Sequence, residues 1–211
     1  MTRVLLAMAL TAGSARAEWT VAAYLGGSHT ADRDVIVSQP DGEHLFRGVS
    51  WESRSFASPP YYGVQVADYF AAAGRFGVRL DFFHDKVYAA GDALLPALQR
   101  FSLSHGLNYL MADAALRQTW GLFDAYAGIG AGTVIPHVEA ESQRGTTDAY
   151  QWFRGVAGKA FAGAVLRLGS RLGAFVELRA SIARVRVSVP EGEVKASFFT
   201  QHAIAGALAR F

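Results

Sequence analysis

Three histidines and one glutamate are the residues of this chain best suited to chemistry on a substrate. His84, His105 and His137 lie toward the ends of three consecutive strand-like segments, and Glu139 follows two residues after His137. Imidazole and carboxylate groups together suit a transition metal that activates oxygen, and two histidines with one carboxylate are a sufficient set. We therefore expect His84, His105 and His137 as catalytic residues, and the same three histidines with Glu139 as metal ligands.

The same residues also fit other interpretations. They could form hydrogen bonds within the rim of a barrel, since the two-residue period of a strand places His105 on the face of Leu103 and Leu107 unless a bulge intervenes. A deacylase would need a serine, a histidine and an acid in contact. Ser104 and His105 are adjacent, so an unbroken strand points them to opposite faces, and a deacylase is not expected.

The elements that must position these residues are strands joined by alternately long and short connections. Eight strand-sized segments are found, at 19–29, 61–70, 75–89, 101–117, 122–137, 154–168, 172–187 and 195–211. The connections alternate in length, with long ones at 30–60, 90–100, 138–153 and 188–194 and short ones at 71–74, 118–121 and 169–171. Outer-membrane barrels have short periplasmic turns and longer outer loops. The chain therefore predicts an all-β fold, an eight-stranded antiparallel transmembrane β-barrel.

Both ends of the chain favour the same location. Arg3, the apolar run 4–10 and the small-x-small pattern at 15–17 predict a cleaved signal peptide over residues 1–17. A single barrel domain would then cover 18–211. The last ten residues form a strand-like segment that ends on Phe211, which is typical of the closing strand of outer-membrane barrels. We expect a protein exported to the bacterial outer membrane and present there as a monomer.

Charged residues alternate with apolar ones inside several segments. An arginine or lysine that faces lipid at the bilayer midplane costs about 2–4 kcal/mol, so the charged residues must face inward. An eight-stranded barrel is just wide enough for its side chains to fill it. We expect a closed lumen holding a polar network of Arg79, Asp81, Asn108, Glu177 and Arg179.

Composition narrows the possible partners and cofactors. The formal net charge is +2 and the charged residues are scattered along the chain, which argues against a nucleic-acid partner. Exposed arginines and lysines could instead bind the phosphates of lipopolysaccharide. The chain has no cysteine, so it has neither a disulfide nor thiolate chemistry. Gly128, Gly130 and Gly132 share one face of a strand, which indicates either barrel curvature or a groove for an acyl chain or sugar.

Several short motifs occur in an order that is similar to a known family. They are Gln39-Pro40-Asp41-Gly42, Ser58-Pro59-Pro60-Tyr61-Tyr62-Gly63-Val64, His84-Asp85-Lys86-Val87-Tyr88-Ala89, Phe101-Ser102-Leu103-Ser104-His105-Gly106-Leu107-Asn108 and Ile135-Pro136-His137-Val138-Glu139. Together, over nearly the whole of residues 18–211, the chain resembles the alphaproteobacterial outer-membrane barrels called lipid A oxidases. The resemblance implies an oxygen-dependent oxidation of the proximal glucosamine of lipid A to an aminogluconate unit.

This resemblance sets the expected partner and cofactors. The partner would be lipid A or lipopolysaccharide in the outer membrane, and molecular oxygen would be the oxidant. Oxidation by oxygen without a flavin or haem motif needs some redox centre, so a divalent metal of open identity is expected. The alternative is a non-enzymatic structural or adhesive barrel whose long outer loops bind external partners.

Overall fold

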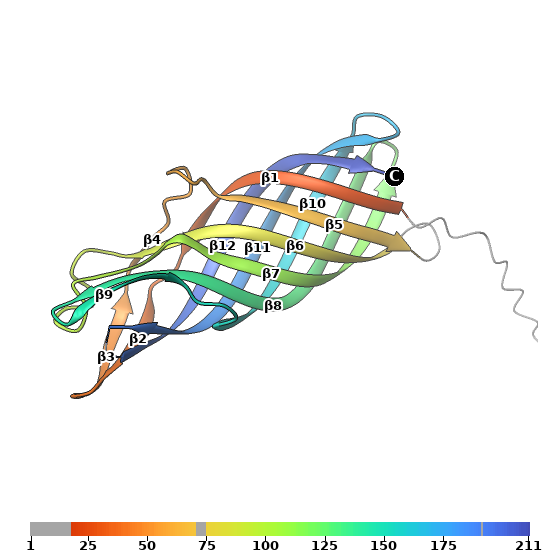
Figure 1. Ribbon diagram of the computed structural model, residues 1–211. Coiled ribbons are helices and arrows are strands. Elements are labelled where there is room, and N and C mark those ends of the chain that lie inside the picture. The colour runs from red at the N-terminus through yellow and green to blue at the C-terminus, as the bar shows by residue number, and fades with distance from the viewer. Residues whose placement is uncertain (1–17, 71–74, 191) are drawn as a thin grey trace, which may run out of the picture.

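The chain forms a closed antiparallel barrel in the computed structural model, which describes residues 18–70, 75–190 and 192–211 (Figure 1). Within these ranges eight strands build the wall, in the order β1-β5-β6-β7-β8-β10-β11-β12. They are β1 Glu18–Thr30, β5 Tyr62–Phe70, β6 Phe76–Ala89, β7 Arg100–Trp120, β8 Phe123–Ser142, β10 Gly155–Arg167, β11 Leu172–Val189 and β12 Gly192–Arg210. The eight-stranded barrel is thus confirmed. The expected signal peptide and the turn at 71–74 lie outside the described residues.

The first and last strands close the barrel. β1 pairs with β12 from Thr20↔Arg210 to Thr30↔Thr200, and the Phe211 amide donates to the Trp19 carbonyl at 2.9 Å. The carboxy-terminal segment is therefore the closing strand. Over the part of the chain that the structure describes, no helix is long and apolar enough to cross a bilayer.

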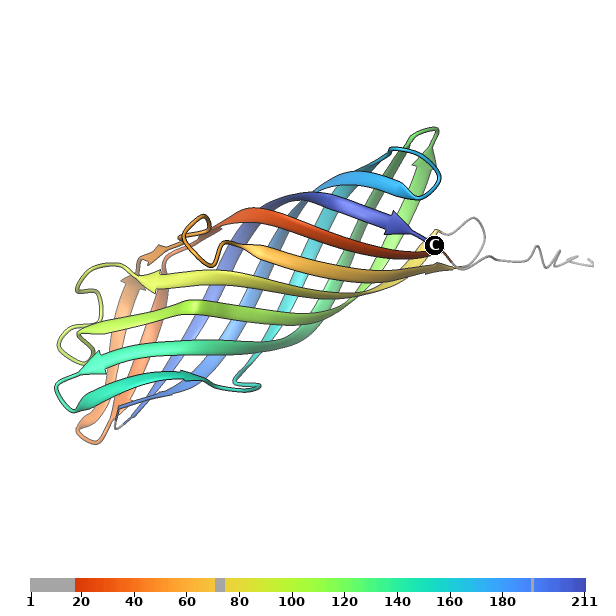
Figure 2. The same cartoon turned by 45° about the horizontal axis from the view of Figure 1, so that its top comes forward.

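The end opposite the carboxy-terminus carries additional short strands, and we call it the outer end (Figures 1 and 2). These are β2 Arg33–Gln39, β3 Gly42–Val49, β4 Trp51–Glu52 and β9 Gly145–Tyr150. β2 pairs with β12 and with β3, while β9 pairs with β8. Segments expected to be irregular loops are thus partly hairpins, because β8 and β12 extend far enough to offer free edges for pairing.

The outside of the wall is apolar along its length. On β6, Val78 and Leu80 are 53% and 61% exposed, whereas the alternating Arg79 and Asp81 are 4% and 0% exposed. The other wall strands also present exposed apolar residues, among them Val21, Leu25, Val64, Leu110, Leu116, Ile129, Val176, Leu178 and Ile182. This arrangement of apolar outside and charged inside is the reverse of a water-soluble barrel and suits a lipid surrounding.

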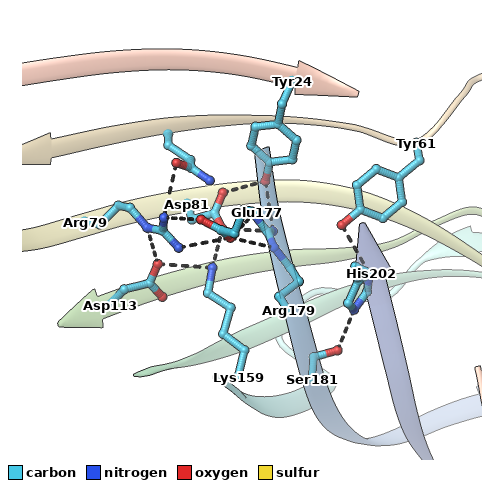
Figure 3. A network of polar contacts seen from close by, with 11 residues as sticks. Tyr24, Tyr61, Arg79, Asp81, Asp113, Lys159, Glu177, Arg179, Ser181 and His202 are labelled. Carbon is cyan, nitrogen blue, oxygen red and sulfur yellow. Dashed lines mark hydrogen bonds and ion pairs between the residues drawn. The ribbon is translucent and has the colours of Figure 1, made fainter. Parts of the chain in front are cut away.

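An ionic layer fills the membrane-level lumen (Figure 3). Arg79 donates to Asp113 Oδ2 at 2.7 Å and to Glu177 Oε2 at 2.6 Å. Arg179 donates to Glu177 Oε1 at 2.9 Å and to Asp81 Oδ2 at 3.1 Å.

Two further residues complete this layer. Lys159 bonds to Asp81 and lies 3.1 Å from Asp113, and the Tyr24 hydroxyl donates to Asp81 Oδ1 at 2.6 Å. Three cations (Arg79, Lys159, Arg179) thus face three carboxylates (Asp81, Asp113, Glu177), so the layer is neutral.

The ionic layer depends on glycines that face inward. A Cβ added at Gly130 would collide with Asp113 Oδ1, and one added at Gly128 would collide with the Phe161 ring and the Ala114 carbonyl. The glycines therefore leave room for lumen side chains and close backbone approach, as the curvature interpretation predicts. Because the glycine face points into a filled lumen, the structure favours the curvature interpretation over a groove for an acyl chain.

Toward the outer end the interior is apolar. Phe83, Tyr109, Leu107 and Phe198 are each fully buried there, and the Trp51 ring of β4 packs on Phe198 with ring centroids 4.9 Å apart. We expected a polar network to fill the lumen, and at this end apolar side chains take its place. The difference arises because the strands continue beyond the apolar outer belt, where water surrounds the wall and a conventional hydrophobic core is favourable.

Candidate metal centre on the outer wall

His105, His137 and Glu139 form a compact group at the outer end of β7 and β8. One ligand atom from each lies within 4.8 Å of the other two. His105 Nδ1 lies 2.7 Å from Glu139 Oε1, and the two imidazole centroids are 4.8 Å apart. Three of the four expected metal ligands are therefore brought together from two neighbouring strands.

A bulge in β7 makes this group possible. The pairing of β7 with β8 shifts between Ser102↔Glu139 and Leu107↔Pro136, so β7 carries two more residues than β8 in this interval. Gly106 lies within the bulge at φ 112°, a backbone conformation that favours glycine. As a result the His105 side chain is 57% exposed although Leu103 and Leu107 are fully buried inside. The two-residue period of a strand would place His105 on the same face as Leu103 and Leu107. The bulge turns its side chain to the opposite face.

The group faces away from the barrel interior. Val134 and Val138 of β8 are fully buried, and His137 and Glu139 alternate with Val138 on the opposite face. The group lies where β9 pairs with β8, at His137↔Tyr150 and Glu139↔Asp148. It therefore sits on the outside of the wall, in strand extensions beyond the membrane-spanning segments.

Glu139 is held in place by donors from β7. Ser104 Oγ donates to Glu139 Oε1, while Ser102 Oγ and Arg100 Nη2 donate to Oε2 at 3.4 and 3.0 Å. Burial by itself would raise the pKa of the Glu139 carboxyl. The hydrogen bonds from Ser104 and His105, with the charge of Arg100, outweigh burial and hold that pKa below its usual value. Glu139 is therefore an ionised, oriented carboxylate at neutral pH.

His137 is half enclosed by β9. The Tyr150 ring packs edge-on against it at 4.4 Å, and its Nε2 lies 3.4 Å from Asp148 Oδ1. Partial burial, followed by the positive field of His105, lowers the pKa of His137 below its usual value. Its Nδ1 is buried without a hydrogen-bond partner among the described residues. A neutral imidazole with a free nitrogen beside a carboxylate is a donor set that suits a divalent metal.

His84 is not part of this group. Its Nδ1 lies 2.9 Å from Asn108 Oδ1, and its ring stacks on Tyr62 with centroids 5.2 Å apart. Its Nε2 has no hydrogen-bond partner among the described residues, and the expectation that His84 is a ligand or catalytic residue stays a prediction that this geometry does not support. The neighbouring Asp85 turns inward, where it accepts from Ser28 Oγ at 2.6 Å.

The structure corrects the position of Asn108 as well. Leu107, Tyr109 and Met111 face the interior, so Asn108 lies on the outer face with His84 and does not join the lumen network. The phase that we assigned to this strand was the opposite one, because the odd-numbered residues Leu103, Leu107 and Asp113 face the interior on both sides of the bulge. The other four expected lumen residues do lie together in the ionic layer. We missed Asp113, Lys159 and Tyr24, although the rule that charges face inward applies to Asp113 and Lys159 too.

Ser104 and His105 are closer than an unbroken strand allows. The bulge brings Ser104 Oγ within 3.1 Å of His105 Nδ1, which corrects the expectation that they point to opposite faces. A catalytic triad places the serine and the acid on different imidazole nitrogens. Here both Ser104 and Glu139 meet Nδ1, so this geometry does not support a deacylase.

Comparison with known proteins shows the fold. No family model and no curated protein matches the chain. Among solved structures, the outer membrane protein OprG from Pseudomonas aeruginosa is 11% identical with a TM-score of 0.53, over 92% of this chain and 95% of that chain. Neisserial surface protein A has 13% identity, a TM-score of 0.48 and coverage of 92% and 97%. AlkL in lipid bilayers has 14% identity, a TM-score of 0.48 and coverage of 100% and 97%. The likeness to OprG shows that the chain has the fold of outer-membrane β-barrels.

Proposed function

We propose that this protein is an outer-membrane barrel that oxidises lipid A, converting the proximal glucosamine to an aminogluconate unit with molecular oxygen. The observation that carries the proposal is the group of His105, His137 and Glu139 on the outside of the wall. A lumen enzyme would act on solutes, but a centre on the outer surface beside the apolar belt meets the headgroups of the surrounding lipid. The resemblance to lipid A oxidases supports the same substrate.

The location in the outer membrane rests on two features. The barrel fold is the one used by outer-membrane proteins, and its outside carries exposed apolar residues while its inside carries the paired charges. We place the end of the barrel with the β2–β3 and β8–β9 hairpins on the external side of the membrane. The short turns at 121–122 and 168–171 then face the periplasm. The metal centre then lies on the external side of the membrane, next to the leaflet that holds lipopolysaccharide.

The residues of the group fit a divalent transition metal. His105, His137 and Glu139 would hold it, while Ser104, Ser102 and Arg100 keep the Glu139 carboxylate ionised and oriented. A metal bound there supplies the one-electron chemistry that lets oxygen react with an organic substrate. In the overall reaction the sugar hemiacetal loses two electrons and two protons, and oxygen takes them up as hydrogen peroxide. Water then opens the lactone to the acid.

The direct test is the mass of lipid A from cells that express the protein and from cells that lack it. Oxidation of the hemiacetal to the acid adds one oxygen, so we expect an additional species heavier by one oxygen atom only in expressing, aerated cells. The host must supply lipid A whose proximal glucosamine has a free hemiacetal. Unchanged lipid A in that host would contradict the oxidase and favour the structural or adhesive alternative, in which the β2–β3 and β8–β9 hairpins bind external partners.

Metal binding should depend on pH in a definite direction. The pKa of His137 lies below its usual value near 6.5, so its imidazole is neutral at pH 7 and becomes protonated only as the pH falls below that value. Protons compete with metals for imidazole nitrogen. We expect the purified barrel to bind Co²⁺ more weakly at pH 5 than at pH 7, as measured by calorimetry. Equal affinity at both pH values, or in a His137→Ala variant, would place the metal elsewhere.

A further inference from the structure

A second site is formed by a basic groove on the outer wall of β10, β11 and β12. The groove has a volume of about 640 Å³, and its cations are Arg154, Arg184, Arg186 and Lys195. Arg184 and Arg186 alternate with the buried Val185 and so face outward. All four cations therefore stand on the outside of the barrel, at its outer end.

Two of these cations have no acidic partner. Arg186 lies 2.9 Å from Glu193, and Lys195 lies 3.0 Å from Glu43. Arg154 and Arg184 make no ion pair with any residue that the structure describes. The one carboxylate that lines the groove is that of Asp34, which accepts a hydrogen bond from the Gly48 amide. The groove thus retains a positive charge that an anionic group can neutralise.

The same groove is lined by apolar side chains. Leu45, Val156 and Phe153 are 53%, 66% and 66% exposed. Phe153 is held at φ 54°, which is unfavourable for a residue with a side chain. Exposed apolar groups beside unpaired arginines suit an amphiphile, because one ligand then meets both.

The wall below the groove continues this pattern. An apolar hollow on these three strands and the neighbouring β1 is lined by many small residues, including Ala162, Ala164, Ala203 and Ala205. Val156 in the basic groove and Ala162 are six residues apart on β10, about 20 Å along a strand. A strand tilted by about 40° descends about 15 Å over that length, which is half the thickness of the hydrocarbon core. The groove and the hollow therefore lie at the depths of a lipid headgroup and of its acyl chains.

We propose that the basic groove binds a phosphate of lipid A, with the acyl chains along β10, β11 and β12. The inference rests on the proposed location in the outer membrane but not on oxidation. The groove adjoins the metal centre, since Tyr150 packs on His137 and the next residue, Gln151, bonds to Ser188 of β11 in both directions at 2.7 Å. A phosphate held by Arg154 and Arg184 would place the lipid on the same side of the barrel as His137.

The test is retention of lipid by the barrel after reconstitution in phosphatidylcholine discs. The discs contain a minor fraction of either phosphorylated lipid A or phosphatidylglycerol, and native mass spectrometry counts the bound molecules. Each cation near a membrane surface adds about fivefold in affinity for an anionic lipid. Arg154→Gln with Arg184→Gln should therefore weaken lipid A binding about thirtyfold, while Arg75→Gln with Arg171→Gln, two exposed arginines near the other end, should not.

Three outcomes would overturn the proposal. One is equal retention of lipid A by the R154Q/R184Q protein and the unmodified barrel. Another is equal retention of phosphatidylglycerol and lipid A, which would make the groove a general anionic site. The third is loss of lipid A binding in a H105A/H137A protein, which would place the lipid at the metal centre. A H105A/H137A protein that binds lipid A but leaves it unoxidised separates this inference from the proposed function.

Discussion

Replacing Arg179 by methionine should lower the free energy of unfolding of the barrel by about 3–5 kcal/mol, because removing one member of a buried ion pair leaves its partners uncompensated. The Arg179 guanidinium is fully buried and bonds to Glu177, Asp81 and Tyr24. Without it the lumen would hold three carboxylates against two cations. The midpoint of urea unfolding in lipid vesicles, followed by tryptophan emission, measures the loss.

A matched control lies on the same strand. Arg184 has the same side chain but faces outward and makes no ion pair with the described residues. Arg184→Met should therefore shift the urea midpoint by much less, since surface substitutions are usually within about 0.5 kcal/mol. If both variants unfold at the same urea concentration, the ionic layer contributes nothing specific to stability.

Replacing His137 by alanine should reduce the proposed oxidation of lipid A at least hundredfold while the barrel stays folded. The His137 imidazole is the neutral nitrogen donor of the group, and loss of even a supporting residue of a metal site costs about 10- to 100-fold. Activity is read from the mass of lipid A in expressing cells. Retained heat-modifiability on electrophoresis shows that the variant barrel is intact.

His84→Ala is the control variant for His137→Ala. His84 lies on the same outer wall but pairs with Asn108 and has no ligand atom in the group. We expect the H84A protein to keep most of its oxidation activity. Equal and severe losses in H84A and H137A would instead restore the three-histidine site that the chain spacing suggests.

The eight wall strands could be predicted because the sequence features that indicate a strand lie within one short segment of the chain. Long and short connections alternate along the chain, and charged residues such as Arg79 and Glu177 alternate with apolar ones that face lipid. The β2–β3 and β8–β9 hairpins were not predicted. β2 carries the apolar residues Val35 and Val37 but is only seven residues long, and β9 is short and mostly polar. The hairpins form only because the edges of β12 and β8 are available.

The candidate site was predictable in part, and the phase of β7 decides which part. Two-residue counting assigns Asn108 to the lumen and His105 to the face of Leu103. In the structure the phase is the same on both sides of the bulge, with Leu103 and Tyr109 inside, so Asn108 lies outside. The extra residues near Gly106 turn only His105 outward. A bulge depends on the pairing with neighbouring strands, so a single glycine in the chain does not reveal it. The order of the strands along the chain was enough to predict that His105 lies near His137. That His84 lies outside their group is known only from the positions of the side chains.

The bulge at Gly106 also separates two parts of the wall that can change independently. Below it, the register of β7 with β8 runs without interruption from Leu107↔Pro136 to Trp120↔Phe123 and supports the ionic layer. Above it, the register restarts. Residues could therefore be inserted or exchanged in the upper part without moving any pairing in the lower part. The segments that carry His105, His137 and Glu139 can therefore be redesigned while the register of the lipid-facing part of the barrel is kept.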